Sequence, residues 1–588
     1  MKHFGNKLLV VLILTFVLFS CESDDFLDIK PKSFFTSENV YNNPAGFEAG
    51  LVNMRKALTN TTYGSKRNNL VCEWSASEAA VPALQMDWNA TTPNSDRFYQ
   101  FLNLYIDAYE QIKNANTLIS RADDIEWPSQ AEKDQVLAEA LWHRSFWYYW
   151  LVNSYGDVPF IGKEIRGAKL DFQSHSRWTV LDRIQSDMET SVANLPVSAA
   201  PGQVTQAAGN HLLTKIYLAN LEFDKAITSA SSVINGSHAL MTSRFGVDAG
   251  DPSLNLLWDL HRPDNKNAPE NTETILAMVD RYDLPTDAKT RGTYTMRHWN
   301  CAWYNGAVKD SEGFSGTIAE GPQYAALGRG NPDLAMSTYM AYNIWNNFGD
   351  TWDNTPDLRR ADANWIDNHE ILYNRESSID FGKPIDPKLM ANPADSLVRL
   401  FPAIHYKVFV PQEDPNVRPV GGAGDMYLYR LAETYLLRAE AYFWKEDFIN
   451  AAADINAVRT RANAVSIAPG DVDLGFIFDE RARELYVESI RHAEMVRASY
   501  IMASLNKGGY SLDSFSESSW WYDRVISLNN FYPLEYFFFV GAAKINPHNV
   551  LWPISSNVIT ANTQGRINQN IGYVGADQNV PPLETIDE

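Results

Sequence analysis

The sequence predicts a mostly α-helical protein, in which pairs of helices form a scaffold that carries one loop-rich, variable face. Two observations predict this fold class. Apolar residues recur at three- and four-residue steps over several long segments, the spacing that places them on one face of a helix. Between about residues 237 and 420 this periodicity weakens and Gly, Pro, Asn and Asp become frequent, which is typical of loops.

The N-terminal segment has the features of a secretory signal peptide. Two lysines precede an apolar run from Leu8 to Phe19. As a helix this run measures about 18 Å, too short for a hydrocarbon core of roughly 30 Å, so we expect a signal peptide over residues 1–20 rather than an anchor helix. Leu18-Phe19-Ser20-Cys21 is similar to a bacterial lipobox, and the acidic stretch Glu22–Asp25 is similar to that of surface-exposed lipoproteins, or else a plain solvated linker. We therefore expect Cys21 to carry a lipid anchor.

The first helical region is predicted over about residues 98–235. Its second helix, from about Asp134 to Tyr155, is apolar nearly all round and should therefore be buried. The turn Gly156-Asp157-Val158-Pro159 ends this helix, because Gly and Pro interrupt helical periodicity. The other predicted helices of this region are Phe98 to Arg121, Trp178 to Leu195, and a helical hairpin from Gln206 to Ile234.

The second helical region is predicted over about residues 425–505 and also begins with a hairpin. Tyr429 to Tyr442 leads through a short turn at Lys445-Glu446-Asp447 into Ala451 to Ala462. Small residues such as Ala432 let paired helices approach closely, so both hairpins are predicted to be of tetratricopeptide type. A long helix from Phe478 to Ala503 and a C-terminal tail at 546–588 complete one body over residues 21–588, with the loop-rich insertion at 237–420 and a short strand at Thr274 to Val279.

Composition narrows the classes of function. The chain has 588 residues, of which 45% are hydrophobic and 21% charged, ordinary values for a globular protein. It has 50 basic against 72 acidic residues, and its net charge of −22 argues against nucleic acid as a partner, since phosphates would be repelled. Of its three cysteines, Cys72 and Cys301 are expected to be separate buried thiols. Aromatic residues are abundant at 12%.

No motif predicts catalysis, a metal site or a cofactor. The sequence has no His-Glu-x-x-His, no Gly-x-Ser-x-Gly and no phosphate-binding loop that ends in Gly-Lys-Ser/Thr. The carboxylate pair of a glycoside hydrolase leaves no sequence spacing, so a hydrolase remains an open alternative on this evidence. We expect a protein that is not an enzyme, with no catalytic residue, no metal ligand and no cofactor.

Several motifs resemble, in order along the chain, those of the SusD/RagB family of nutrient-binding outer-membrane lipoproteins. Most of their charged residues are expected to tie helices together, and Glu480 to Arg491 is expected to form ion pairs on one helix face. The last motif is expected to pack the tail back onto the bundle. The motifs are Phe26-Leu27-Asp28-Ile29-Lys30-Pro31, Ala138 to Tyr149 with Tyr155-Gly156-Asp157-Val158-Pro159, Asp357-Leu358-Arg359, Arg430-Leu431-Ala432-Glu433 with Ala439-Glu440-Ala441, Glu480 to Arg497, and Leu551-Trp552-Pro553-Ile554 with Gln569 to Tyr573.

The resemblance implies a lipid-anchored protein of the outer membrane, exposed on the cell surface. Such a protein binds an oligosaccharide or polysaccharide and delivers it to a TonB-dependent transporter of the SusC type. It also implies four tetratricopeptide-like helix pairs beneath a variable ligand-binding face. Two alternatives remain open: a binder of peptide or another non-sugar nutrient on the same scaffold, and a helical-repeat envelope adaptor without a small ligand.

Aromatic residues in polar surroundings are the candidates for the ligand site. A flat ring covers the apolar C–H face of a sugar, and a neighbouring amide or guanidinium bonds its hydroxyls. Arg67 or Arg297 could bond the hydroxyls, although nothing in the sequence distinguishes them. The predicted ligand-binding residues are Trp88, Asn89, Trp299, Trp303, Tyr304, Trp345 and Trp352.

Overall fold

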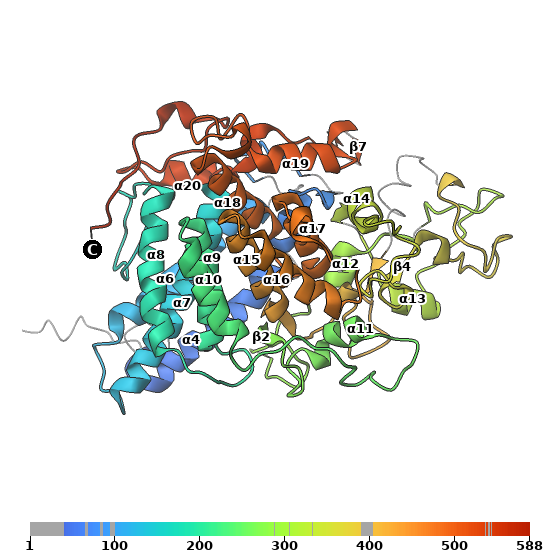
Figure 1. Cartoon of the computed structure of the whole chain (residues 1–588), viewed down its shortest axis with the longest axis horizontal. Helices are drawn as coiled ribbons and strands as arrows, with labels where there is room; N and C mark the ends of the chain where they lie inside the picture. Colours follow the sequence, from blue (N-terminus) through green and yellow to red (C-terminus); the bar gives the residue numbers. More distant parts are fainter. Residues whose placement is uncertain are drawn as a thin grey trace, which may run out of the picture.

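The computed structural model confirms the mostly α-helical fold class. The structure describes residues 40–64, 69–82, 86–93, 100–286, 288–304, 306–331, 333–389, 404–534, 537–538, 541–542 and 544–587. Helices fill the left and centre of Figure 1, the loop-rich part lies at the right, and the C-terminal segment runs across the top. Within these ranges, none of the helices is both long and apolar enough to cross a membrane. The predicted signal peptide and Cys21 lie outside the described residues.

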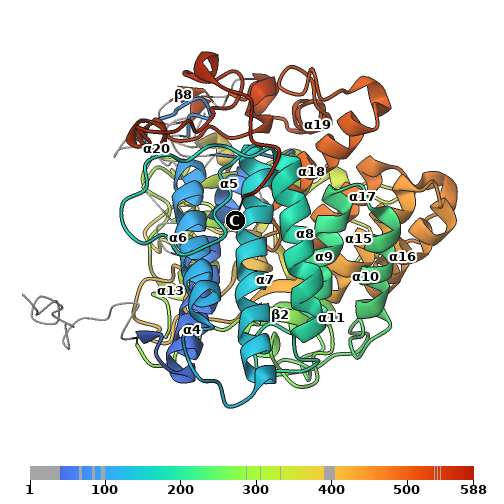
Figure 2. The ribbon, with the colours of Figure 1, turned by 90° about the vertical axis from the view of Figure 1, so that its left-hand side faces the viewer.

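The helices of residues 100–234 lie side by side in chain order (Figure 2). Each packs on its neighbour in sequence: α6 on α7, α7 on α8, and α9 on α10. Ser129, Ser176 and Thr205 begin three of them by accepting a backbone hydrogen bond, the role for which Ser and Thr are favoured. The bounds are α4 (Pro44–Tyr63), α5 (Asn69–Ser75), α6 (Gln100–Arg121), α7 (Gln130–Tyr155), α8 (Arg177–Asn194), α9 (Gln206–Ala219) and α10 (Phe223–Ile234).

The α7 helix is the aromatic centre of the core, as its apolar periphery predicts. Trp142 stacks on Phe146 with ring centroids 5.5 Å apart, and Trp147 stacks on Trp150 at 5.9 Å. All four side chains are buried. The helix ends at Gly156, whose φ of 67° places it in the left-handed region that favours glycine.

The two predicted hairpins, α9 with α10 and α15 with α16, pack against one another although about two hundred residues separate them. The contact is made between α10 and α15. The predicted long helix from Phe478 to Ala503 is wrong: Val487 has a φ of 68°, and the chain divides into two helices. The bounds of this region are α15 (Leu431–Trp444), α16 (Phe448–Arg461), α17 (Leu474–Leu485) and α18 (Arg491–Ser504).

The break between α17 and α18 accompanies a buried ion-pair network. Glu488 lies in it and accepts hydrogen bonds from Arg430 Nε and Lys407 Nζ, both at 2.5 Å. Within α17, Glu480 pairs with Arg483 as expected, but it also receives Arg359 from the Asp-Leu-Arg motif at 2.7 Å. The expectation of ion pairs confined to one helix face is therefore too narrow, since most of these pairs join different elements.

Short strands and helices make up the loop-rich part and its borders. The strand predicted at Thr274 to Val279 is β2 (Thr274–Met278), which pairs antiparallel with β6 (Met426–Arg430). Cys72 and Cys301 are separate buried thiols, as expected. The other paired strands are β1 (Ala80–Pro82) with β3 (Leu334–Met336), β4 (Trp365–Ile366) with β5 (Ile404–His405), and β7 (Phe537–Phe538) with β8 (Gly541–Ala542). The short helices are α11 (Leu256–His261), α12 (Thr295–Trp299), α13 (Gly321–Leu327) and α14 (Thr338–Ala341).

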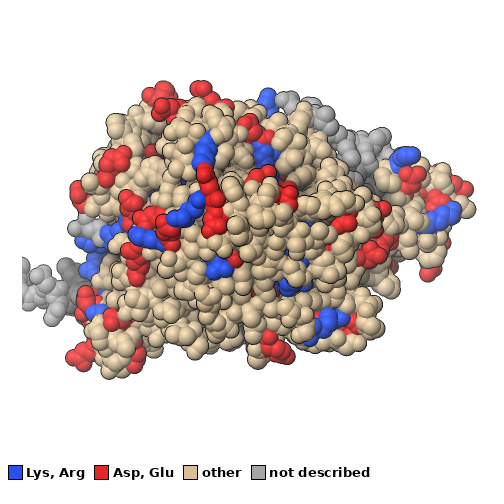
Figure 3. All heavy atoms as spheres, in the orientation of Figure 1, with Lys and Arg blue, Asp and Glu red and all other residues tan. Residues whose placement is uncertain are grey.

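The C-terminal tail packs back onto the helical scaffold, as its motif predicts. Asn570 Nδ2 donates to the carbonyl oxygens of Tyr155 at 3.0 Å and Trp552 at 2.7 Å, so one amide joins the end of α7 to the tail. The tail contains α20 (Ser556–Ala561) and follows α19 (Trp520–Leu528). In the view of Figure 3, acidic and basic side chains are mixed over the surface and broad areas without charge separate them.

Candidate ligand-binding site

Trp88 and Asn89 take part in internal contacts. Trp88 is 1% exposed, its Nε1 donates to the Tyr532 hydroxyl at 3.3 Å, and its ring stacks against Trp552 with centroids 6.2 Å apart. Asn89 is exposed, but its Oδ1 accepts a hydrogen bond at 2.9 Å from His548. The expectation of a stacking platform at Trp88 does not hold in this structure, because neither ring face is open to a ligand.

Trp299, Trp303 and Trp345 are also buried, at 8%, 0% and 1% exposure. Trp299 meets Tyr486 edge to face at 5.6 Å, and Trp345 donates from Nε1 to the Met340 carbonyl oxygen at 3.1 Å. Polar neighbours in sequence suggested exposure, but packing within the folded chain buries these rings, and the partner of Trp299, Tyr486, is distant in sequence. As a correction, these three tryptophans belong to the buried interior and do not offer an open ring face to a ligand.

Trp352 is partly exposed. Its ring meets Tyr342 edge to face at 5.0 Å, and the Arg360 guanidinium carbon lies 4.9 Å from its ring centroid. One face is thus engaged in a cation–π contact. Trp352 does not line either of the two large cavities described below, so its predicted role stays a prediction.

Tyr304 is partly exposed and lines a cavity of about 970 Å³ in the loop-rich part, hereafter the Tyr304 cavity. Its walls come from three separate segments, around α12, α13 and residues 409–419. Its lining includes Met296, Tyr304, Glu320, Tyr324, Arg329 and Arg418. Among the predicted site residues that the structure describes, Tyr304 alone lies on this cavity.

Two tyrosines form the aromatic corner of the Tyr304 cavity. Tyr304 and Tyr324 meet edge to face with ring centroids 5.3 Å apart, and both are partly exposed. The Tyr304 hydroxyl donates to the Gly330 carbonyl oxygen at 2.9 Å, which holds the ring in place. Buried Trp303 lies behind them, 6.0 Å from Tyr304 and 6.4 Å from Tyr324 between centroids.

Backbone hydrogen bonds join the three segments into a frame. Arg297 N donates to Val420 O at 2.8 Å, and Arg329 N donates to Pro419 O at 2.7 Å. Asn300 Nδ2 donates to Leu327 O at 2.6 Å, which ties α12 to the end of α13. Gly328 ends α13 with a φ of 82°, and a Cβ there would lie 2.8 Å from Met296 Cε. The cavity wall therefore depends on glycine at this position.

Arginines give the Tyr304 cavity its charge. Arg329 and Arg418 line it, and Arg297 donates from Nη1 to the Arg329 carbonyl oxygen at 3.4 Å. Within the described part of the chain, none of these three guanidinium groups has a carboxylate within 4.0 Å, and Glu320 is the one acidic residue that lines the cavity. Burial raises the pKa of Tyr324, and Tyr304 raises it further, while the three arginines oppose this rise.

A second cavity of about 850 Å³ has the opposite charge, because most of its charged lining residues are acidic. Arg281 is its basic lining residue and pairs with Asp425 at 2.5 Å. Tyr282 is its one aromatic lining residue. The acidic residues that line it are Asp264, Glu270, Asp280, Asp283 and Asp425. In the part of the chain that the structure describes, no cluster of three or more His, Cys, Asp or Glu side chains could hold a metal ion.

Of the described residues that line the Tyr304 cavity, Tyr304 is the one that the sequence predicted as a ligand-binding residue. Tyr324 is also an aromatic residue among polar neighbours in a predicted loop, so its sequence context is the same as that of Tyr304. Arg329 and Arg418 carried no local signal, because only the folded chain brings them near the two tyrosines. Arg297, noted in the sequence without a distinguishing feature, is the arginine that contacts Arg329. Arg67 lies outside the described residues.

Comparisons with known proteins agree with one another. Residues 403–573 match the model described as the SusD family, and residues 25–218 match one described as starch-binding associating with outer membrane. The chain is 22% identical over 582 residues to SusD-like protein P25 of Formosa agariphila, covering 95% of this chain and 97% of that protein. It is also 22% identical over 441 residues to starch-binding protein SusD of Bacteroides thetaiotaomicron, covering 72% and 74% of the two chains.

A solved structure shares the fold. The surface glycan-binding protein A from Bacteroides fluxus superposes with a TM-score of 0.61 at 14% identity, over 90% of this chain and all of that one.

Proposed function

Since this chain belongs to the SusD family, we propose that it is a cell-surface glycan-binding lipoprotein that captures oligosaccharides and delivers them to a TonB-dependent transporter of the SusC type. The names of two relatives support a carbohydrate ligand, since one is called starch-binding and the other glycan-binding. The lipobox-like Leu18-Phe19-Ser20-Cys21 supports a lipid anchor, and the outer-membrane description of the matching model supports the location.

The observation that carries the proposal is the aromatic corner of the Tyr304 cavity. Two partly exposed tyrosine rings at 68° to one another offer flat and edge surfaces to a sugar, whose C–H groups pack on aromatic faces. Guanidinium groups beside them supply several donors for hydroxyl oxygens. A volume of about 970 Å³ suits a short oligosaccharide.

The lining favours binding over catalysis. A glycoside hydrolase needs two carboxyl groups about 5 to 10 Å apart, one on each side of the scissile bond. Glu320 is the one acidic side chain among the described residues that line the Tyr304 cavity. The second cavity has five acidic residues but a single aromatic side chain, so it offers little surface for stacking on sugar rings.

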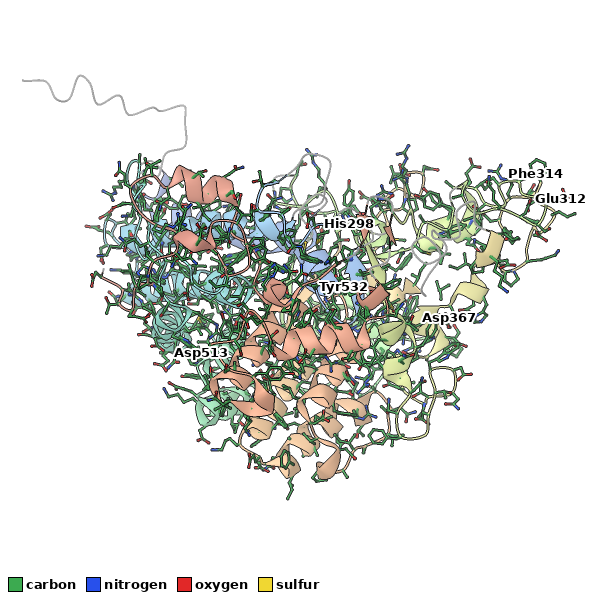
Figure 4. The ribbon with its side chains drawn as sticks, turned by 90° about the horizontal axis from the view of Figure 1, so that it is seen from above. His298, Glu312, Phe314, Asp367, Asp513 and Tyr532 are labelled. Atoms are coloured by element: carbon green, nitrogen blue, oxygen red, sulfur yellow. The ribbon has the colours of Figure 1, made fainter. Side chains whose placement is uncertain are left out.

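A glycan-array screen of the lipid-free protein tests the proposal, followed by calorimetry with the best ligand. Tyr304→Ala is expected to lower affinity at least tenfold while circular dichroism stays unchanged. Phe314→Ala is the matched control: Phe314 is 68% exposed in the loop-rich part and lies at its far end, away from His298 of α12 (Figure 4). Equal affinity of both variants and wild type would reject the Tyr304 cavity as the site. Saturable binding of peptides and of no glycan would favour the alternative nutrient.

A further inference from the structure

We propose that the Tyr304 cavity selects glycans that carry oxyanions, either carboxylates of acidic sugars or sulfate esters, over neutral glycans of the same backbone. This inference rests on the proposed function, since it names the class of glycan that the same cavity would bind. It is based on three arginines, Arg297, Arg329 and Arg418, and on the charged residues near them.

Positive charge converges on the Tyr304 cavity without carboxylate partners among the described residues. Arg297 and Arg329 are partly buried and adjacent, and Arg418 is exposed on the lining. In the same protein, buried arginines such as Arg359 and Arg497 each contact two or more carboxylates. The chain has 22 more acidic than basic residues, so carboxylates are abundant elsewhere. Within the described structure, none of the three arginines has a carboxylate within 4.0 Å.

The arginines at the cavity repel one another. Burial lowers the pKa of Arg297, and the neighbouring Arg329 lowers it further. An oxyanion between guanidinium groups relieves this repulsion and accepts charge-assisted hydrogen bonds, often two from one arginine. A neutral hydroxyl relieves none of it.

One negative charge on the cavity lining opposes this selection. Glu320 lines the cavity, but it is exposed and precedes α13, and the two lining arginines outnumber it even without Arg297. The second cavity, with five acidic residues and Arg281 engaged by Asp425, would repel an oxyanion. The two cavities therefore differ in the sign of their charge, and the one with the aromatic corner is positive.

Calorimetry with two matched ligand pairs tests the inference. One pair is an oligogalacturonide and its carboxyl-reduced form, and the other is a sulfated galactan oligosaccharide and its desulfated form. Wild-type protein is expected to bind the charged member of one pair at least tenfold more tightly. The pair that shows the preference identifies the oxyanion as carboxylate or sulfate.

Two variants of Arg329 distinguish the effect of its charge on ligand binding from the effect of its hydrogen bonds. Arg329→Gln should reduce the preference for the charged ligand to less than threefold and change neutral binding by less than threefold, while Arg329→Lys should keep part of the preference. Arg291→Gln is the matched control, since Arg291 is exposed in the same part of the molecule but does not line the cavity. All variants are checked by thermal melting.

Two results would overturn the inference. One is equal binding of the charged and neutral members by wild type. The other is an equal loss of both in Arg329→Gln, which would assign Arg329 to hydroxyl binding. In either case a loss of binding in Tyr304→Ala would leave the proposed function standing. If no glycan on the array or in the pairs binds saturably, the proposed function itself fails, so the two failures are distinguishable.

Discussion

Tyr304 and Tyr324 meet edge to face, with ring centroids 5.3 Å apart and ring planes inclined by 68°. Tyr304 follows α12, whereas Tyr324 lies within α13, so the pair joins two segments of the loop-rich part. Such an aromatic pair contributes about 0.5–1.5 kcal/mol beyond its buried area. In this geometry each ring helps to hold the other in place.

Replacing Tyr324 should therefore weaken ligand binding in two ways. It removes a ring surface on which the ligand packs, and it removes the contact that helps to hold Tyr304 in place. Tyr324→Ala is expected to lower glycan affinity at least tenfold, while Tyr324→Phe should lower it less than threefold, because the ring is retained. Calorimetry measures both values. If Tyr324→Phe loses as much affinity as Tyr324→Ala, the hydroxyl rather than the ring carries the contact.

Gly328 is expected to be required for the shape of the cavity. In Gly328→Ala the new Cβ would lie 2.8 Å from Met296 Cε and 3.0 Å from the Pro419 carbonyl oxygen, at a φ of 82°. We expect lower glycan affinity and a loss of stability beyond the cost of backbone strain, which is about 1–2 kcal/mol. Gly313→Ala is the control, because Gly313 has a φ of 84° but no atom within 4 Å of the added Cβ. Equal effects of the two variants on affinity would contradict the prediction.

Arg359 should be essential for stability, because it connects the Asp-Leu-Arg motif to α17. Its guanidinium contacts Asp357 at 2.7 Å, Glu480 at 2.7 Å and Glu484 at 3.0 Å, all of them buried. Arg359→Gln leaves buried carboxylates without compensation and is expected to lower the free energy of unfolding by about 3–5 kcal/mol. Urea denaturation measures this loss. The exposed Arg166 pairs with Glu164 at 3.2 Å, and Arg166→Gln should cost less than about 1 kcal/mol.

Glu78 is expected to make the protein less stable as the pH falls below about 5. Burial raises the pKa of this carboxyl, but Arg491 and Arg524 outweigh burial and lower it to about 2. The unfolded carboxyl has a pKa near 4.5. Because the folded value is the lower one, the stabilisation is present in full above the unfolded pKa and is lost as the pH falls toward 2.

This stabilisation is on the order of 3 kcal/mol at neutral pH. In Glu78→Gln the difference from wild type in the free energy of unfolding should be largest at pH 7 and should shrink by pH 3, as followed by urea titrations. The control Glu312→Gln removes a carboxylate at an exposed position, on the loop tip labelled in Figure 4. A difference between Glu78→Gln and wild type that stays constant from pH 7 to pH 3 would refute the assignment.

Most of the scaffold follows from local sequence. The apolar periphery of α7 predicts a buried helix, and small residues with short turns predict the α9–α10 and α15–α16 hairpins, because helix periodicity and turn chemistry act over a few residues. The break at Val487 could not be predicted in this way. Its sequence is helical in period, and the partners of Glu488, Arg430 and Lys407, lie 58 and 81 residues away in sequence.

The ligand site, like the scaffold, depends partly on local sequence and partly on contacts between distant segments. By itself, the sequence determined the helical scaffold, the loop-rich part and a set of aromatic residues in polar surroundings. Only the tertiary structure decided that Trp88, Trp303 and Trp345 are buried while Tyr304 and Tyr324 line a cavity. The physical reason is that exposure depends on contacts between distant segments, whereas the polarity of neighbours in sequence reports only local preference. The same contacts bring the arginines to the tyrosines and set the charge of the cavity.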